Sequence, residues 1–135
     1  MKVLVIGGTG SIGGEVARGL LRAGIKVRCM SRYANKLKTL PEEIEGCVGD
    51  LEKPATLGAA FADVDAVFLM TALSRNETLQ GLAAITAAKT ANVNNLVYLS
   101  VPTPPGSDHI PHYLGKVPIE RALRESGMRY TILRP

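Results

Sequence analysis

Gly7-Gly8-Thr9-Gly10-Ser11-Ile12-Gly13-Gly14 follows an apolar, β-branched run at residues 1–6 and precedes a helical pattern over residues 12–23. The spacing of Gly7, Gly10 and Gly13 suits a strand-to-helix turn that brings a phosphate close to bare backbone. The anion would rest at the positive end of the helix, with Thr9, Ser11 and Ile12 completing its contacts. An ordinary turn is the alternative interpretation. The stretch predicts a pyrophosphate-binding loop.

Short apolar runs recur along the rest of the chain and predict buried parallel strands. With the first run they cover residues 2–6, 26–30, 44–48, 66–70, 95–100 and 130–133. Helical patterns lie between them, at residues 12–23, 34–39, 54–61, 76–91 and 113–126. This alternation predicts an α/β fold: a doubly wound parallel (Rossmann) sheet of about six strands in the order 3-2-1-4-5-6, in three layers. We place the reversal of strand order, and the ligand crevice, at the helix of residues 76–91.

Length and composition predict one domain and exclude several classes of protein. The 135 residues suffice for a single core without a metal or a disulfide. No apolar stretch approaches the roughly 20 residues of a transmembrane helix, and a cleaved signal peptide would remove the glycine loop, so we expect a cytoplasmic protein without membrane contact. Cys29 and Cys47 lack the spacing of a redox or zinc motif and are expected to be reduced core residues. We expect no metal site.

The net charge of +4 is concentrated near the start of the chain. Seven basic residues lie close together there: Arg18, Arg22, Lys26, Arg28, Arg32, Lys36 and Lys38. Such a cluster can attract nucleic acid, but 4% aromatic residues and no Trp leave few platforms for base stacking. Because the cluster borders the predicted pocket, an anionic nucleotide accounts for it better, and we expect no nucleic-acid partner.

The residues after the second strand favour NADP(H) over NAD. NAD sites usually place Asp or Glu there to hold the ribose hydroxyls, but this chain has Ser31-Arg32. The planar fork of Arg32 suits a 2′-phosphate, with Ser31 and Lys36 close by. One arginine would supply roughly a ten- to hundred-fold preference. A solvated surface arginine is the alternative.

Residues at two further strand ends are expected to line the same crevice. Asp50-Leu51 would meet the adenine edge, and the small residues Thr71-Ala72 would leave space for ribose and nicotinamide. An Asx turn leading to Pro54 is an equal alternative for Asp50. The proline-rich residues 101–111 predict a loop over the site.

Motifs along essentially the whole chain resemble those of one family. They are the glycine loop, Ser31-Arg32, Gly49-Asp50-Leu51, Gly115-Lys116, Glu120, Ser126-Gly127 and Tyr130-Thr131-Ile132-Leu133-Arg134-Pro135. Together they resemble the NmrA-like branch of the atypical short-chain dehydrogenases/reductases. The resemblance implies NADP(H) binding, contact of Lys116 with the nicotinamide ribose, and Ser100 beside the reacting carbonyl.

The chain departs from the wider pattern at two points. Many short-chain reductases carry a proton-donating tyrosine four residues before the lysine, a position that His112 occupies here, with Tyr113 one residue later. Either side chain could be the acid, and a polar helix start is the alternative for His112. Family members also continue into a substrate-binding lobe, so we expect either a missing lobe or a homodimer formed through the exposed last strand.

Three functions follow as expectations. The first is an NADP(H)-dependent reductase that passes hydride to a small carbonyl or quinone, with an unknown substrate. The second is a non-enzymatic sensor whose partner binding depends on NADP(H). The third is an enzyme similar to a sugar-nucleotide epimerase, which would prefer the tyrosine that this chain lacks.

Overall fold

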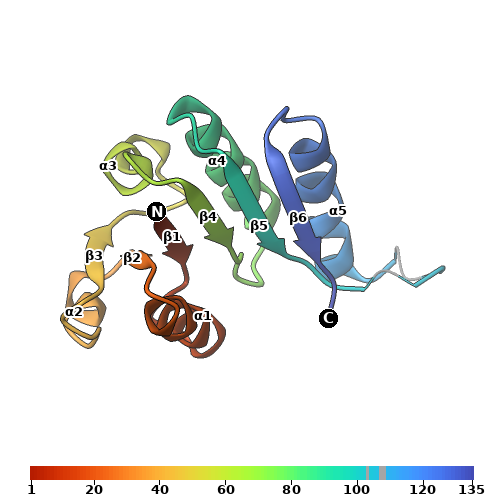
Figure 1. Ribbon diagram of the computed structural model, residues 1–135. Coiled ribbons are helices and arrows are strands. Elements are labelled where there is room, and N and C mark those ends of the chain that lie inside the picture. The colour runs from red at the N-terminus through yellow and green to blue at the C-terminus, as the bar shows by residue number, and fades with distance from the viewer. Residues whose placement is uncertain (103, 107–108) are drawn as a thin grey trace.

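A single parallel sheet organises the chain (Figure 1). The computed structural model describes residues 1–102, 104–106 and 109–135, with the backbone alone at residues 111–113. Its strands are β1 (Lys2–Ile6), β2 (Lys26–Ser31), β3 (Glu45–Val48), β4 (Ala66–Leu69), β5 (Asn95–Leu99) and β6 (Arg129–Leu133). All pairings are parallel and the order is β3-β2-β1-β4-β5-β6. The predicted fold and strand order are confirmed.

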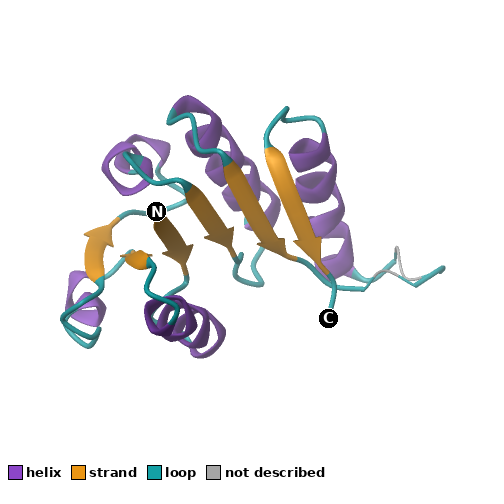
Figure 2. Ribbon diagram, in the orientation of Figure 1, coloured by secondary structure: helices purple, strands orange, loops and turns teal. Residues whose placement is uncertain are grey.

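Helices cover both faces of this sheet (Figure 2). They are α1 (Ser11–Arg22), α2 (Ala34–Leu37), α3 (Gly58–Phe61), α4 (Glu77–Thr90) and α5 (Pro111–Arg124), with a 3₁₀ turn, η1, at Pro54–Thr56. Helices α1 and α2 lie on one side, and α3, α4 and α5 on the other. The arrangement has the three predicted layers. Within the described residues, no helix is long and apolar enough to cross a membrane.

The alternation of side chains along buried strands divides the core in two. In β1, Val3 and Val5 pack on the α1 side, while Leu4 and Ile6 pack toward α3 and α4. The strand is apolar on both faces because parallel strands in such sheets are covered on both sides. Gly24 ends α1 with a φ of +79° and Gly127 follows α5 with a φ of +80°, as expected of residues after helix C-termini.

Two predictions about the middle of the chain are wrong. The helix expected over residues 54–61 is split into η1 and α3 by Leu57. The strand order reverses between β3 and β4, along the connection that contains η1 and α3, and not at α4. Helix α4 joins the neighbouring strands β4 and β5, so it continues the order instead of reversing it.

A buried arginine ties that connection to the sheet. Arg28, in β2, is only 7% exposed, and its Nη1 donates to the carbonyls of Ala59, Ala60 and Ala62 at 3.1, 2.8 and 2.7 Å. These carbonyls lie at the C-terminal end of α3, which a cation there stabilises. Arg28 therefore belongs to the interior, and the expectation that it is part of a basic cluster bordering the pocket is wrong.

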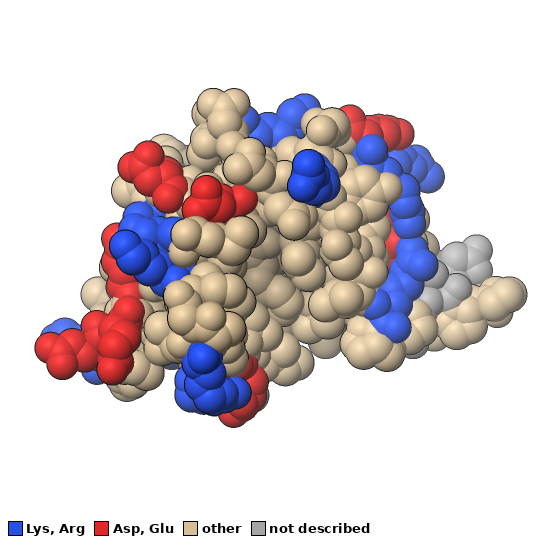
Figure 3. All heavy atoms as spheres, viewed as in Figure 1, with Lys and Arg blue, Asp and Glu red and all other residues tan. Residues whose placement is uncertain are grey.

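One part of the sheet lacks a covering layer. On the α1 side of β5 and β6, no helix of the described residues packs over the strands, and this face carries few charges (Figure 3). Val97 and Leu99 of β5 lie beside Thr131 and Leu133 of β6 on it. Leu133 is 42% exposed. Apolar surface of this sheet is open to solvent.

Candidate functional site

The glycine loop has a backbone geometry that side chains would prevent. Gly7 has a φ of +82°, and its carbonyl accepts a hydrogen bond from the Gly10 N–H at 3.0 Å. A Cβ at Gly13 would lie 2.0 Å from the Gly7 carbonyl oxygen, and one at Gly8 would lie 2.2 Å from the Cys29 Sγ. The loop therefore rests directly on α1 and on β2.

The N-terminus of α1 presents free donors and no negative charge of its own. Gly10 is the N-cap residue, and no side chain of the described residues caps the first turn or places an acid in it. Backbone N–H groups at such an end lack intrahelical partners and attract anions. Ser11, Ile12 and Gly13 lie in this turn and not in the cleft wall. Their predicted part in phosphate binding stays a prediction.

A cleft of about 260 Å³ runs along the carboxyl ends of β1 to β4. It brings together most of the predicted contact residues: Gly7, Thr9, Gly10, Ser31, Arg32, Lys36, Asp50, Leu51 and Ala72. It also adds lining residues to which the sequence analysis gave no role in the site: Ile6, Met30, Tyr33, Gly49, Met70 and Gln80. Segments distant in sequence thus meet where the strand order reverses, which is where open α/β sheets bind ligands.

A cationic group with an aromatic centre forms the β2 end of the cleft. The guanidinium of Arg32 lies 5.3 Å from the centre of the Tyr33 ring, and the Lys36 Nζ lies 5.2 Å from the same centre. The Tyr33 N–H donates to the Ser31 hydroxyl at 3.1 Å. Cation–π contacts hold both positive charges beside one ring. An aromatic residue next to Arg32 in the sequence was the available signal for this role.

The structure bears out the Asx-turn alternative for Asp50. Its Oδ1 accepts a hydrogen bond from the Glu52 N–H at 2.9 Å, and its own N–H donates to the Thr56 hydroxyl at 2.9 Å. Asp50 still lines the cleft, beside Leu51, whose side chain is almost buried. Glu52 accepts hydrogen bonds from Asn76 and Gln80 at 2.6 and 3.1 Å and so joins this loop to the start of α4.

Lys116 lies in a buried ion pair. Its Nζ is 2.7 Å from the Oε2 of Glu77, and the same oxygen accepts a hydrogen bond from the Thr71 hydroxyl at 2.8 Å. The sequence analysis singled out Thr71 and Lys116 but missed Glu77, which is 39 residues from its partner and carries no motif of its own. Contact of Lys116 with a ribose stays a prediction.

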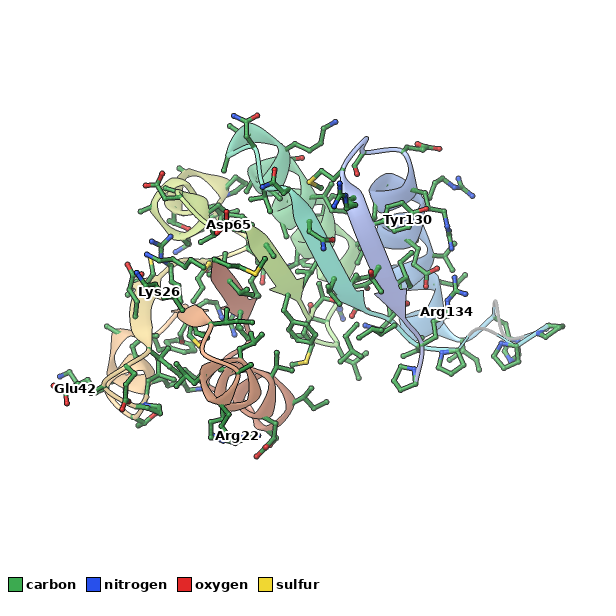
Figure 4. All side chains as sticks on the ribbon, viewed as in Figure 1. Arg22, Lys26, Glu42, Asp65, Tyr130 and Arg134 are labelled. Atoms are coloured by element: carbon green, nitrogen blue, oxygen red, sulfur yellow. The ribbon has the colours of Figure 1, made fainter. Side chains whose placement is uncertain are left out.

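Ser100 belongs to a second buried network. Its hydroxyl donates to Glu120 Oε2 at 2.5 Å, Arg134 binds both carboxylate oxygens, and Arg124 donates to Oε1 at 3.1 Å. Burial opposes ionisation of Glu120, but the hydrogen bonds from Arg134 and Ser100 outweigh it and hold the pKa of this carboxyl below its usual value. Figure 4 labels Arg134 just after β6, beside α5.

Tyr98 lies close to both networks. It is fully buried in β5, and the Lys116 Nζ lies 5.9 Å from the centre of its ring. Burial raises the pKa of its hydroxyl, and the carboxylates of Glu77 and Glu120 act in the same direction. Tyr98 therefore stays protonated at neutral pH.

The remaining predicted site residues are placed as follows. His112 and Tyr113 lie in the first turn of α5, but their side chains are outside the described part of the chain. Among the described residues no group of three or more His, Cys, Asp or Glu is placed to hold a metal ion. Cys29 is buried and Cys47 is partly buried, both as free thiols. Arg22 and Lys26 point outward at the end of α1 and the start of β2 (Figure 4).

Sequence comparison agrees with this architecture. The model of the NmrA-like family matches residues 1–134. The chain belongs to the NmrA-like family. The resemblance inferred from the motifs is therefore confirmed.

Curated relatives of this NmrA-like chain include reductases and an assembly factor. It is 38% identical to an NAD(P)H azoreductase of Xenophilus azovorans over 136 residues, which cover 98% of the chain and 47% of the relative. It is 35% identical to the photosystem II assembly factor Ycf39 of Trieres chinensis, over 99% of the chain and 45% of the relative. The chain spans about half the length of the curated relatives it matches.

Solved structures likewise match nearly the whole of this chain to about half of a longer protein. The NmrA-like chain superposes with a TM-score of 0.91 on the triphenylmethane reductase of Citrobacter sp. complexed with NADP(H), at 27% identity, over 99% of the chain and 49% of the reductase. An NADPH-dependent quinone oxidoreductase of Escherichia coli complexed with NADPH gives a TM-score of 0.86 at 25% identity, over 99% and 48% of the two chains. Both of these neighbours bind NADP(H).

Proposed function

We propose that this chain is the NADP(H)-binding part of a reductase that passes hydride to a small carbonyl or quinone. The observation that carries the proposal is the cationic end of the cleft, where Arg32 and Lys36 flank the Tyr33 ring. No acid follows β2 to receive the ribose hydroxyls of NAD, and a guanidinium beside an ammonium suits a 2′-phosphate. The cofactors of the Citrobacter and Escherichia coli neighbours support the same choice.

The residues present fit such a cofactor from one end of the cleft to the other. The glycine loop and the uncapped start of α1 would hold the pyrophosphate, and Asp50 and Leu51 would face the adenine. Ala72, after β4, would leave room for the ribose and nicotinamide. When bound, NADPH supplies the hydride. The chain would bind and orient the cofactor.

Hydride transfer to a carbonyl is accompanied by a proton, which a side chain of the protein can donate. The hydroxyl proton of Ser100 is directed at Glu120, so in this arrangement it is not available for donation to a substrate carbonyl oxygen. Burial holds Tyr98 protonated and away from solvent. We therefore propose the donor at the start of α5, with His112 and Tyr113 as the two candidates.

Calorimetric titration with NADP+, NADPH and NAD+ tests the binding part of the proposal. We expect NADPH to bind with micromolar affinity and Arg32→Ala to weaken it about ten-fold or more, without a similar effect on NAD+. Arg22→Ala is the matched control, because it removes an exposed arginine at the end of α1, away from the cleft, and should change neither affinity. Absence of NADP(H) binding, or equal effects of the two substitutions, refutes the assignment.

Consumption of NADPH with a panel of quinones, aldehydes and ketones tests the reductase part. The panel is run with this chain and with any longer protein that its gene encodes, alongside His112→Ala and Tyr113→Phe. We expect turnover of at least one acceptor and its loss in one of the two variants. No turnover of any acceptor refutes the reductase.

A second candidate is a non-enzymatic factor whose partner binding depends on NADP(H). It is favoured by the assembly-factor relative and by the engagement of both Ser100 and Lys116 in buried networks. Partner capture from a lysate with and without NADPH tests it. Capture that NADPH does not change contradicts this candidate.

A further inference from the structure

The ion pair between Glu77 and Lys116 lies in the protein interior. The two side chains are 3% and 8% exposed, and the Thr71 hydroxyl adds a third polar group to the Glu77 carboxylate. Removing two charges from water costs several kcal/mol, and apolar residues of similar volume often stabilise a core as well. The pair is therefore weak evidence of a stabilising role, and its position in the fold indicates another use.

The pair does not line the cofactor cleft itself but is joined through Thr71 to the segment after β4 that does. Thr71 lies between Met70 and Ala72, both of which line the cleft. Because β1 separates β4 from β2, this wall faces the part of the cleft opposite the cationic end. A dinucleotide with its 2′-phosphate at Arg32 would have its nicotinamide toward this wall.

A close approach of two helices holds the Glu77 carboxylate in place. A Cβ added at Gly115 would lie 3.0 Å from Glu77 Oε1, so the carboxylate is packed directly against the backbone of α5. The Thr78 hydroxyl donates to the Gly115 carbonyl at 2.8 Å and fixes α4 to α5 at the same level. Because Gly115 has no side chain, the Glu77 carboxylate can approach α5 closely enough to pair with Lys116.

We propose that Glu77 neutralises Lys116 beside the nicotinamide site, so that the chain accepts the oxidised and the reduced cofactor with comparable affinity. The inference rests on the proposed function, since it concerns the same cleft. NADP+ carries a positive charge on its nicotinamide ring that NADPH lacks, while the two forms share every phosphate. An uncompensated ammonium at this wall would repel NADP+ alone, and an uncompensated carboxylate would attract it alone.

Titration of NADP+ and NADPH into four proteins tests the inference: wild type, Glu77→Gln, Lys116→Met and the double variant. We expect Glu77→Gln to raise the ratio of the NADP+ to the NADPH dissociation constant about ten-fold, the order expected for one uncompensated charge beside the cleft. Lys116→Met should lower the ratio, and the double variant should return it to the wild-type value. Glu45→Gln removes a carboxylate that pairs with Lys2 and Arg28 outside the cleft and should leave the ratio unchanged.

The outcomes separate this inference from the proposed function. A wild type that binds neither form refutes both. An unchanged ratio in Glu77→Gln, or a loss of affinity for both forms by the same factor, refutes the charge-balancing role and leaves the cofactor assignment standing. If Glu77→Gln does not fold, Lys116→Met and the double variant decide the question, because the double variant buries no unpaired charge. A ratio that does not recover in the double variant refutes the inference.

Discussion

Substituting Gly13 by alanine should separate α1 from the glycine loop. The added methyl carbon would lie 2.0 Å from the Gly7 carbonyl oxygen, 2.5 Å from the Gly7 carbonyl carbon and 2.9 Å from the Gly8 nitrogen. All three atoms belong to the backbone, so no side chain can rotate away. Restoring ordinary contact requires a displacement of about 1.4 Å between the helix and the loop.

Gly19→Ala provides a matched control in the same helix. The nearest atom to a Cβ there is the Arg22 Nη2 at 3.9 Å, which is ordinary contact. Both substitutions gain helix propensity, which stabilises a helix by roughly 0.5–1 kcal/mol relative to glycine. The difference in stability between the two variants therefore measures the clash. Overpacking of this kind costs about 1–3 kcal/mol.

Thermal and urea unfolding of both variants provide the stability measurement. We expect Gly13→Ala to melt several degrees below Gly19→Ala, at about 3–4 °C per kcal/mol for a domain of this size. NADPH titration provides the second measurement, and Gly13→Ala should weaken binding about ten-fold or more because the uncapped amides of α1 move. Equal melting temperatures, or equal affinities for NADPH, would refute the argument that this glycine sets the position of the loop.

Three further predictions concern stability and thiol reactivity. Because the pKa of Glu120 is lowered, its ionised form stabilises the fold above about pH 4.5, and this contribution is lost as the pH falls through the folded-state pKa. In urea unfolding, Glu120→Gln should be less stable than the wild type at pH 7, and the difference in unfolding free energy should shrink below pH 4. A difference that does not change with pH would contradict this. Burial raises the pKa of Cys29 to about 11. A thiol reagent at pH 8 should therefore label Cys47 in the native protein and Cys29 only after unfolding. Equal labelling of both thiols in the native protein would contradict the burial of Cys29. Gly81→Ala would place a methyl carbon 2.4 Å from Ile119 Cδ1 and should lower the free energy of unfolding by about 1–3 kcal/mol. Gly58→Ala has open space around it and should not lower it. Equal stability of the two variants in thermal unfolding would count against close packing of α4 on α5.

The parts of the fold that the sequence predicted well have local causes. Short β-branched runs and the glycine spacing act over a few residues, and they predicted the strands and the glycine loop. Strict alternation of strand and helix was enough for the strand order. The place of the reversal was predicted wrongly, because the crossover from β3 to β4 contains only the short η1 and α3, whose sequence pattern is much weaker than that of the long helix at residues 77–90.

The parts of the candidate site that escaped prediction depend on contacts between distant residues. Glu77 reads as an acid in the first turn of a helix, and only the approach of α5 makes it the partner of Lys116. Arg28 reads as one cation of a cluster, and only the position of α3 under β2 makes it an interior residue. Neither partner is within helical or strand spacing, so periodicity carries no information about either pair.

The arginine beneath α3 has a consequence for local unfolding and amide hydrogen exchange. A helix of four residues cannot persist alone, since nucleation costs more than its few hydrogen bonds return. Arg28 attaches the carbonyl end of this helix to β2, a strand in the interior of the sheet. The amides of α3 should therefore exchange with solvent together with those of β2, as one cooperative unit, although about 30 residues separate the two segments.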